Sequence, residues 1–207
     1  MDGLMIDSER LYFAAEREMA AAYGREIRDE QLWPLMGRKP IESLRLLREI
    51  LKIETPPEEL LAWRNRLMLE KMRRDLGAMP GLFEILDAFY GRLKLAVGTG
   101  AQKEFLDLAL DRLGIRDRFD VLQTADAVER GKPDPEIYLL TCRRLELPPG
   151  ECVVLEDARN GVLAGKAAGC RVIAVPSDYT RGQDFSAADW VEPDLFAAAR
   201  RIEGMLT

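Results

Sequence analysis

Four short polar segments could carry out chemistry, and each lies next to an apolar run of the sequence. They are Asp2-Gly3, Thr99-Gly100, Lys132 and Glu156-Asp157. A hydroxyl beside free backbone amides binds an anion, and a fixed ammonium stabilises the charge that accumulates during phosphoryl transfer. Adjacent carboxylates suit Mg²⁺, which takes few protein oxygens together with water and phosphate. These residue types therefore favour a site for a phosphorylated ligand and a divalent cation.

Each segment also has an ordinary structural explanation. Asp2-Gly3 could form a turn, Thr99 could cap the following helix, and Lys132 could be a solvated loop residue. Taken alone, capping is the favoured explanation for Thr99, and for Lys132 the two explanations are balanced. Glu156-Asp157 favours chemistry, because two carboxylates after an apolar strand must be solvated, paired or metal-bound. One of the two could cap the next helix at the same time.

The elements that would position these residues follow from the apolar pattern. Helical spacing predicts helices alone in the first part of the chain, over 8–23, 40–52 and 57–75. After Met79-Pro80-Gly81 short apolar runs alternate with helical ones. This alternation predicts a doubly wound α/β fold with a parallel sheet, whose ligands bind at the carboxyl ends of the strands. The predicted strands are 93–97, 121–124, 152–155 and 172–175, and the predicted helices are 81–90, 102–113, 134–146, 158–168 and 194–205.

Composition excludes several classes of protein. The net charge of −6 argues against a nucleic-acid surface, and no apolar run reaches the roughly 20 residues of a membrane helix. The absence of histidine removes histidine acid/base catalysis, Ser-His triads and histidine-bound zinc. Cys142, Cys152 and Cys170 have no metal-binding spacing and favour reduced thiols. We therefore expect a cytoplasmic protein without nucleic-acid or membrane partners.

The three downstream segments, and above all the phrase Glu156-Asp157-Ala158-Arg159-Asn160-Gly161-Val162, resemble the haloacid dehalogenase superfamily. The resemblance is to the subgroup of small phosphatases and phosphomutases that includes β-phosphoglucomutase and the pseudouridine-5′-phosphatase-like members. It implies a Rossmann-like core formed by 1–8 and 78–207, with an inserted α-helical cap domain over 9–77. It also implies a Mg²⁺-assisted mechanism through an aspartyl-phosphate.

The resemblance also assigns roles to individual residues. Asp2 matches the general acid/base, and its backbone carbonyl matches a Mg²⁺ ligand. Thr99 matches the phosphate-binding hydroxyl, and Lys132 matches the charge-stabilising lysine. Glu156 and Asp157 match the acidic metal motif. Gly3 and Gly100 are expected to bind substrate with their backbones.

The family motif Phe-Asp-x-Asp-Gly places Met1 on the variable position, so the nucleophilic aspartate would be the residue just before Met1. Either the sequence is trimmed at its start, or it is a short form that cannot form the phospho-enzyme. The first explanation is favoured, because loss of a central strand would leave two neighbouring strands unpaired. The chain as given is expected to lack turnover.

The substrate is expected to be a small phosphorylated metabolite, hydrolysed by a monomeric enzyme. Arg38 and Lys39 match cap residues that face the substrate, and a solvated loop pair explains them equally well. A sugar phosphomutase is the alternative, although β-phosphoglucomutases carry a histidine where this chain has Tyr12. A non-catalytic phospho-ligand binder is a third possibility.

Overall fold

The computed structural model describes residues 1–36 and 40–206 and divides into two compact units. One unit comprises Met1–Asp7 and Gly77–Thr207, and the other comprises Ser8–Leu76. Where the chain leaves and re-enters the first unit, the amide of Asp7 donates to the carbonyl of Gly77 (3.2 Å) and that of Met79 to Met5 (2.9 Å). The assignment of residues 9–77 as a closing cap stays a prediction.

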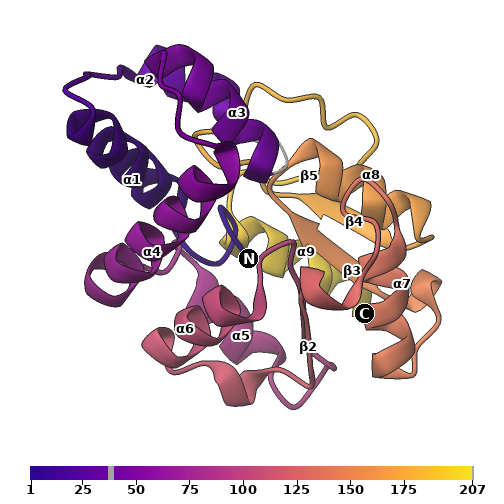
Figure 1. Cartoon of the computed structure of the whole chain (residues 1–207). Coiled ribbons are helices and arrows are strands. Elements are labelled where there is room, and N and C mark those ends of the chain that lie inside the picture. Colours follow the sequence, from indigo (N-terminus) through magenta and orange to yellow (C-terminus); the bar gives the residue numbers. More distant parts are fainter. Residues whose placement is uncertain (37–39, 207) are drawn as a thin grey trace. The chain divides into compact units, whose positions relative to one another are not determined.

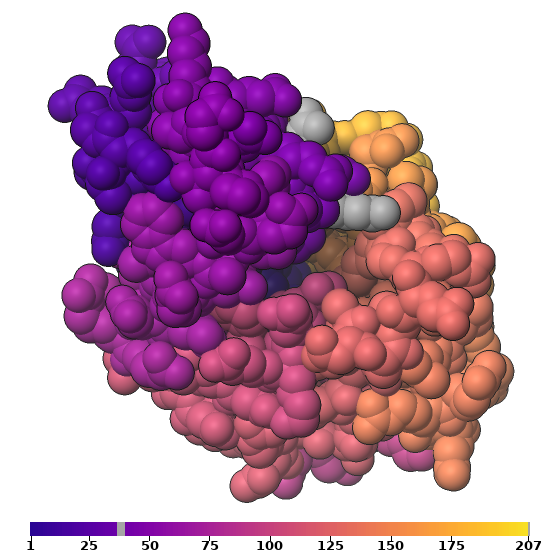
Figure 2. Space-filling model, in the orientation of Figure 1, coloured from indigo at the N-terminus to yellow at the C-terminus, as the bar shows by residue number. Residues whose placement is uncertain are grey.

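In its described part the Ser8–Leu76 unit contains helices and connecting turns but no strand, and Figure 2 shows it as one continuous body of packed atoms. The helices agree closely with the predicted ranges, and only the four-residue α2, too short for helical periodicity, was not predicted. They are α1 (Glu9–Ala22), α2 (Asp29–Leu32), α3 (Pro40–Leu51) and α4 (Pro57–Asp75), with a 3₁₀ turn at Trp33–Leu35. Between α1 and α4 lies a buried ion pair, in which Arg64 Nη1 is 3.5 Å from Glu16 Oε1.

The other unit alternates strands and helices, and all its paired strands are parallel (Figure 1). The predicted α/β class is therefore confirmed. Its strands are β1 (Ala96–Gly98), β2 (Val121–Gln123), β3 (Val153–Glu156), β4 (Arg171–Ala174) and β5 (Trp190–Val191). Its helices are α5 (Leu82–Phe89), α6 (Lys103–Leu113), α7 (Glu136–Leu145), α8 (Arg159–Ala167) and α9 (Leu195–Leu206).

The parallel sheet consists of two separate groups of strands. β1 pairs with β2, and β3, β4 and β5 form a second group in that order. The two groups are separate because no strand among the described residues lies between β1 and β3. β5 is not among the predicted strands, and its Trp190 pairs with Ile173 of β4.

The core of this unit lies on β4, whose Val172, Ile173 and Ala174 are fully buried. Helix α8 packs closely there, because a Cβ on Gly165 would lie 2.8 Å from a methyl of Val172. This contact fixes α8, and with it the turn that carries Glu156 and Asp157. In the described parts of the chain, no helix is both long and apolar enough to span a membrane.

Candidate active site

Thr99 directly follows β1 and is buried. Its amide donates to the carbonyl of Gln123 (3.0 Å), and its Oγ1 accepts a hydrogen bond from the amide of Ala101 (3.1 Å). The N-cap of α6 is Gln102, so the alternative that Thr99 caps this helix is wrong. Gly100 faces open space, since a Cβ there would meet no atom within 4 Å. The backbone at this strand end is therefore accessible to a ligand.

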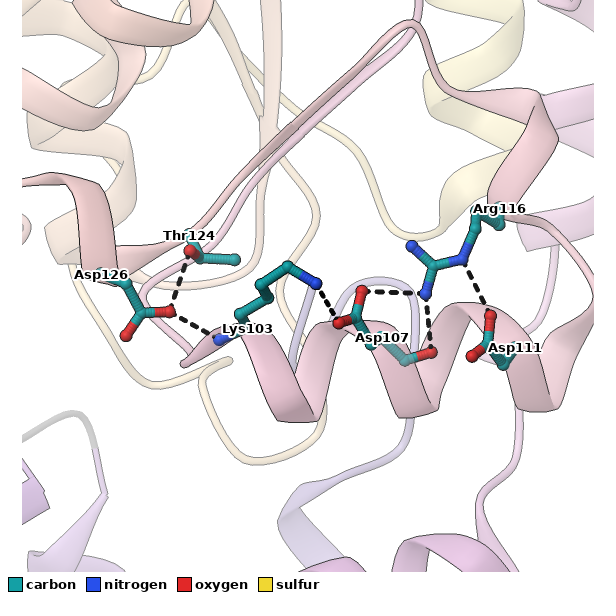
Figure 3. Close-up of polar contacts among 6 residues, drawn as sticks. All are labelled: Lys103, Asp107, Asp111, Arg116, Thr124 and Asp126. Atoms are coloured by element: carbon teal, nitrogen blue, oxygen red, sulfur yellow. Dashed lines mark hydrogen bonds and ion pairs between the residues drawn. The ribbon is translucent and has the colours of Figure 1, made fainter.

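The carboxylate of Asp126 lies at the start of α6, a position that no pattern in the sequence predicted. Its carboxylate accepts hydrogen bonds from the amide of Lys103 (2.7 Å) and from Thr124 Oγ1 (3.1 Å) (Figure 3). A bound anion would be repelled from a helix terminus that already holds a carboxylate. An anion at this loop would therefore lie at the strand end of Thr99 and Gly100 and not at the start of α6.

Lys132 joins the ends of two strands that do not pair with each other. Its Nζ donates to the carbonyl of Gly98 at the end of β1 (3.2 Å) and to the carboxylate of Glu156 at the end of β3. The same Nζ lies 4.8 Å from the ring centroid of Tyr138. One cation is thereby fixed at the carboxyl edge of both parts of the sheet.

The loop that carries Lys132 is tied to the start of α7. The carboxylate of Glu136 accepts from the amides of Glu129 (2.9 Å) and Arg130 (3.0 Å), while Asp134 Oδ1 accepts from the amide of Glu136 (3.0 Å). The hydrogen bond from the Glu129 amide is the main cause that lowers the pKa of Glu136. Glu136 therefore anchors the loop that carries Lys132, and the sequence analysis did not identify it.

Glu156 is a buried carboxylate that stays charged. Burial acts to raise its pKa, but the charges of Lys132 and the N-terminal ammonium, with hydrogen bonds from Lys132 and Tyr138, outweigh burial and lower the pKa. The hydroxyl of Tyr138 donates to Glu156 Oε1. Burial, followed by the charge of Glu156, holds the pKa of Tyr138 well above its usual value. Tyr138 therefore keeps its proton and remains a donor.

Gly161 makes room for this carboxylate. A Cβ at Gly161 would lie 2.0 Å from the carboxyl carbon of Glu156, far inside van der Waals contact. The glycine in the Glu156–Val162 phrase is thus explained by the close approach of helix α8 to the Glu156 side chain.

The Met1–Asp7 segment forms a tight loop around the Met1 carbonyl. This carbonyl accepts the amides of Leu4 (3.3 Å), Met5 (2.7 Å) and Ile6 (3.2 Å). Gly3 takes a left-handed φ of 66°, which favours glycine, and its amide donates to the Ile6 carbonyl (3.0 Å). Met1 lines the same cavity as Gly98 and Glu156, so this loop starts near the strand ends, and Asp2 is the next residue.

The donors at the end of β3 suit a hard cation. Glu156 and Asp157 are both buried, and the N-cap of α8 is Ala158, so neither carboxylate is the capping residue. Among the described residues, no group of three or more acidic, histidine or cysteine side chains could hold a metal. Mg²⁺ fits this setting, because it binds through one or two carboxylates and fills its remaining positions with water and phosphate oxygens. Arg38 and Lys39 lie outside the described residues.

The model of the haloacid dehalogenase-like hydrolase family matches residues 1–175. The chain belongs to this family. The match includes every candidate residue described above.

Two curated relatives are phosphatases by name. The chain is 40% identical over 174 residues to the "Phosphorylated carbohydrates phosphatase" of Thermotoga maritima, covering 82% of this chain and 79% of that one. It is 30% identical over 175 residues to the "Fructose-1-phosphate phosphatase YqaB" of Escherichia coli, covering 84% and 93%.

A solved structure from Thermotoga maritima, described as a "putative beta-phosphoglucomutase", is 31% identical and has a TM-score of 0.83. The alignment covers 100% of this chain and 97% of that one. Together with the family match, these relatives confirm the predicted superfamily and subgroup and make the protein a phosphatase-type hydrolase of this family.

Proposed function

We propose that the protein is a Mg²⁺-dependent phosphomonoesterase that hydrolyses a phosphorylated sugar through an aspartyl-phosphate. The observation that carries the proposal is the position of Lys132, which is held between the Gly98 carbonyl and the Glu156 carboxylate at the strand end where Gly100 faces open space. The names of the two curated relatives, one for phosphorylated carbohydrates and one for fructose 1-phosphate, support the substrate class.

In this proposal the phosphate lies against the Thr99 hydroxyl and the Gly100 amide, and Gly3 contributes its backbone. Lys132 offsets the charge on the phosphate oxygens. Glu156 holds Lys132 in place, and Asp157, Glu156 and the Asp2 carbonyl would hold Mg²⁺. When bound, the metal supplies positive charge that neutralises the phosphoryl oxygens.

Two transfers account for hydrolysis. A carboxylate oxygen attacks phosphorus, the bond to the sugar oxygen breaks, and Asp2 gives its proton to the leaving oxygen. Asp2 then takes a proton from water, whose oxygen attacks phosphorus and releases phosphate and the free carboxylate. Asp2, Glu156 and Asp157 already have other tasks, so we place the attacking carboxylate on the residue before Met1.

The test is product analysis by phosphorus NMR, using the chain extended before Met1 by an apolar segment that ends in aspartate. With Mg²⁺ and fructose 1-phosphate or glucose 1-phosphate, we expect inorganic phosphate as the product. Interconversion of glucose 1-phosphate and glucose 6-phosphate without phosphate release would show a mutase instead. Lys132→Met should abolish either activity, and binding without any product would point to a ligand-binding protein.

A further inference from the structure

The turn that joins β3 to α8 is attached to the chain segment that follows β4. We call residues 156–159 the acidic turn and residues 175–185 the β4 loop. At one end of the acidic turn, the carbonyl of Glu156 accepts a hydrogen bond from the amide of Val175 (2.7 Å). At the other end, the amide of Arg159, the first residue of α8, donates to Gln183 Oε1 (2.7 Å). The β4 loop therefore holds the acidic turn at both of its ends.

The acidic turn cannot supply the second of these acceptors itself. Ala158 is the N-cap of α8, and its methyl group cannot accept a hydrogen bond. The amides of Gly161 and Val162 donate to the carbonyl of Ala158 (3.0 and 3.1 Å), but the amide of Arg159 lies ahead of the first helical hydrogen bond. Gln183 thus caps α8 from a position 24 residues further along the chain.

The β4 loop fixes Gln183 from both sides. Before it, Thr180 Oγ1 accepts the amide of Ser177 (2.9 Å), and the two hydroxyl oxygens, which belong to buried residues, lie 3.1 Å apart. The amide of Gln183 then donates to the carbonyl of Thr180 (2.8 Å). After it, Phe185 is buried in the same hydrophobic cluster as Val162 of α8. The core of the unit therefore determines where the Gln183 side chain lies.

The acceptor at the start of α8 is neutral, whereas three neighbouring helices have a charged one. Carboxylates accept amides in the first turns of α6, α7 and α9, and they belong to Asp126, Asp134 and Asp194. A carboxylate at the start of α8 would add a third negative charge next to the buried carboxylates of Glu156 and Asp157, and like charges at one site repel each other. The amide oxygen of Gln183 caps the helix without this repulsion.

We propose that Gln183 is a positioning residue of the site, which fixes Glu156 and Asp157 at the end of β3 by capping α8 from the β4 loop. Gln183 acts through the backbone of Arg159 and does not itself contact metal or substrate in this proposal. Its effect on Mg²⁺ binding rests on the proposed function, whereas its effect on the position of the acidic turn does not.

Three variants of the 207-residue chain test the proposal. Gln183→Met keeps the length of the side chain and removes the acceptor, whereas Gln183→Glu keeps an acceptor oxygen. Asp194→Ala is the matched control, because it removes the side-chain acceptor at the start of α9, which lies outside the acidic turn. Amide hydrogen exchange is followed by NMR, and Mg²⁺ affinity is measured by calorimetric titration.

Gln183→Met should make the amide of Arg159 exchange about fivefold faster, as expected for the loss of a helix cap. The variant should also bind Mg²⁺ about tenfold more weakly, the lower limit of what loss of a residue that orients a metal ligand costs. Gln183→Glu should keep the Arg159 amide protected and bind Mg²⁺ at least as tightly as the unchanged protein. Asp194→Ala should speed exchange at Ala197 and leave the Mg²⁺ affinity unchanged.

Three results of the titrations would overturn the proposal. They are an unchanged Mg²⁺ affinity in Gln183→Met, a loss of affinity in Gln183→Glu, and an equal loss of affinity in the Asp194→Ala control. The last result would show that loss of any helix cap in this unit weakens the site, so that Gln183 would have no particular role in positioning the acidic turn.

A measurement without metal separates this proposal from the proposed function. The hydroxyl of Tyr138 donates to Glu156, so the NMR signals of the Tyr138 ring and the Glu156 carboxyl carbon report the position of this carboxylate. We expect both signals to shift in Gln183→Met and to stay unchanged in Asp194→Ala. Unchanged signals in Gln183→Met would overturn the proposal. If the unchanged protein binds no Mg²⁺, the proposed metal site is contradicted, and these signals alone decide the role of Gln183.

Discussion

The ammonium of Lys132 and the carboxylate of Glu156 form an ion pair whose side chains are only 18% and 10% exposed. The pair connects the loop before α7 to the end of β3, and the same ammonium reaches the last carbonyl of β1. The Lys132–Glu156 ion pair therefore determines both the charge at the site and the positions of the ends of β1 and β3. A buried ion pair costs desolvation, and loss of one partner leaves the other charge uncompensated.

Lys132→Met should lower the free energy of unfolding by about 3 kcal/mol, because Glu156 would keep its burial and lose its cation. Urea unfolding measures this. Lys166→Met is the matched control, since Lys166 pairs with Asp189 where both side chains are about a third exposed. That control should cost less than about 1 kcal/mol. Equal costs would contradict the role given to the Lys132 pair.

Gly161→Ala should destabilise the protein by about 1–3 kcal/mol through overpacking. The new methyl would collide with the Glu156 carboxyl, which cannot move without losing Lys132 and Tyr138. Gly204→Ala in α9 meets no atom within 4 Å and should stabilise by about 0.5–1 kcal/mol, since glycine is unfavourable within a helix. Thermal unfolding of both variants measures the two changes in stability. Stabilisation by both substitutions, or destabilisation by both, would refute the close contact at Gly161.

Asp157→Asn should weaken Mg²⁺ binding by at least tenfold, because the variant loses the charge of one buried carboxylate at the proposed metal position. Calorimetric titration of Mg²⁺ measures the affinity without requiring turnover. Asp126→Asn is the control, because Asp126 caps α6 and is not assigned to the metal. Loss of affinity in the Asp126 variant, or its retention in the Asp157 variant, would disprove the assignment.

Glu16 should make the protein's stability depend on pH. Burial raises its pKa from 4.5 to about 7, against the opposing charges of Arg64 and Arg17. The folded protein therefore takes up a proton between about pH 4.5 and pH 7. The stabilising contribution is complete below pH 4.5 and is lost as the pH rises through 7, by up to about 3 kcal/mol. The free energy of unfolding of Glu16→Gln, measured across this pH range, should depend less on pH than that of the unchanged protein. An equal dependence on pH in the two proteins would show that another group causes it.

Much of the fold follows from local pattern. The helices 40–52 and 57–75 were predicted almost to the residue because their apolar spacing covers several turns. β5 was missed because a two-residue strand carries no periodic signal. The sheet is divided because no strand among the described residues lies between β1 and β3.

The residues of the candidate site could be predicted where they lie at the ends of predicted strands. Thr99, Lys132 and Glu156 all follow or contact such ends. Tyr138 was not predictable, because its pairing with Glu156 depends on which face of α7 meets β3. Nothing in the sequence distinguishes Asp126 from other surface carboxylates. Its hydrogen bond to the start of α6 depends on the path of the loop after β2, which the sequence pattern does not predict.

Phosphate release from p-nitrophenyl phosphate with Mg²⁺ tests the central claim most directly. Three proteins are compared at equal concentration. One is the 207-residue chain, and the other two carry an additional apolar segment before Met1 that ends in aspartate or in asparagine. We predict turnover by the aspartate version alone, because in-line transfer needs a carboxylate facing phosphorus beside Lys132. Comparable turnover by the 207-residue chain or by the asparagine version would contradict the account.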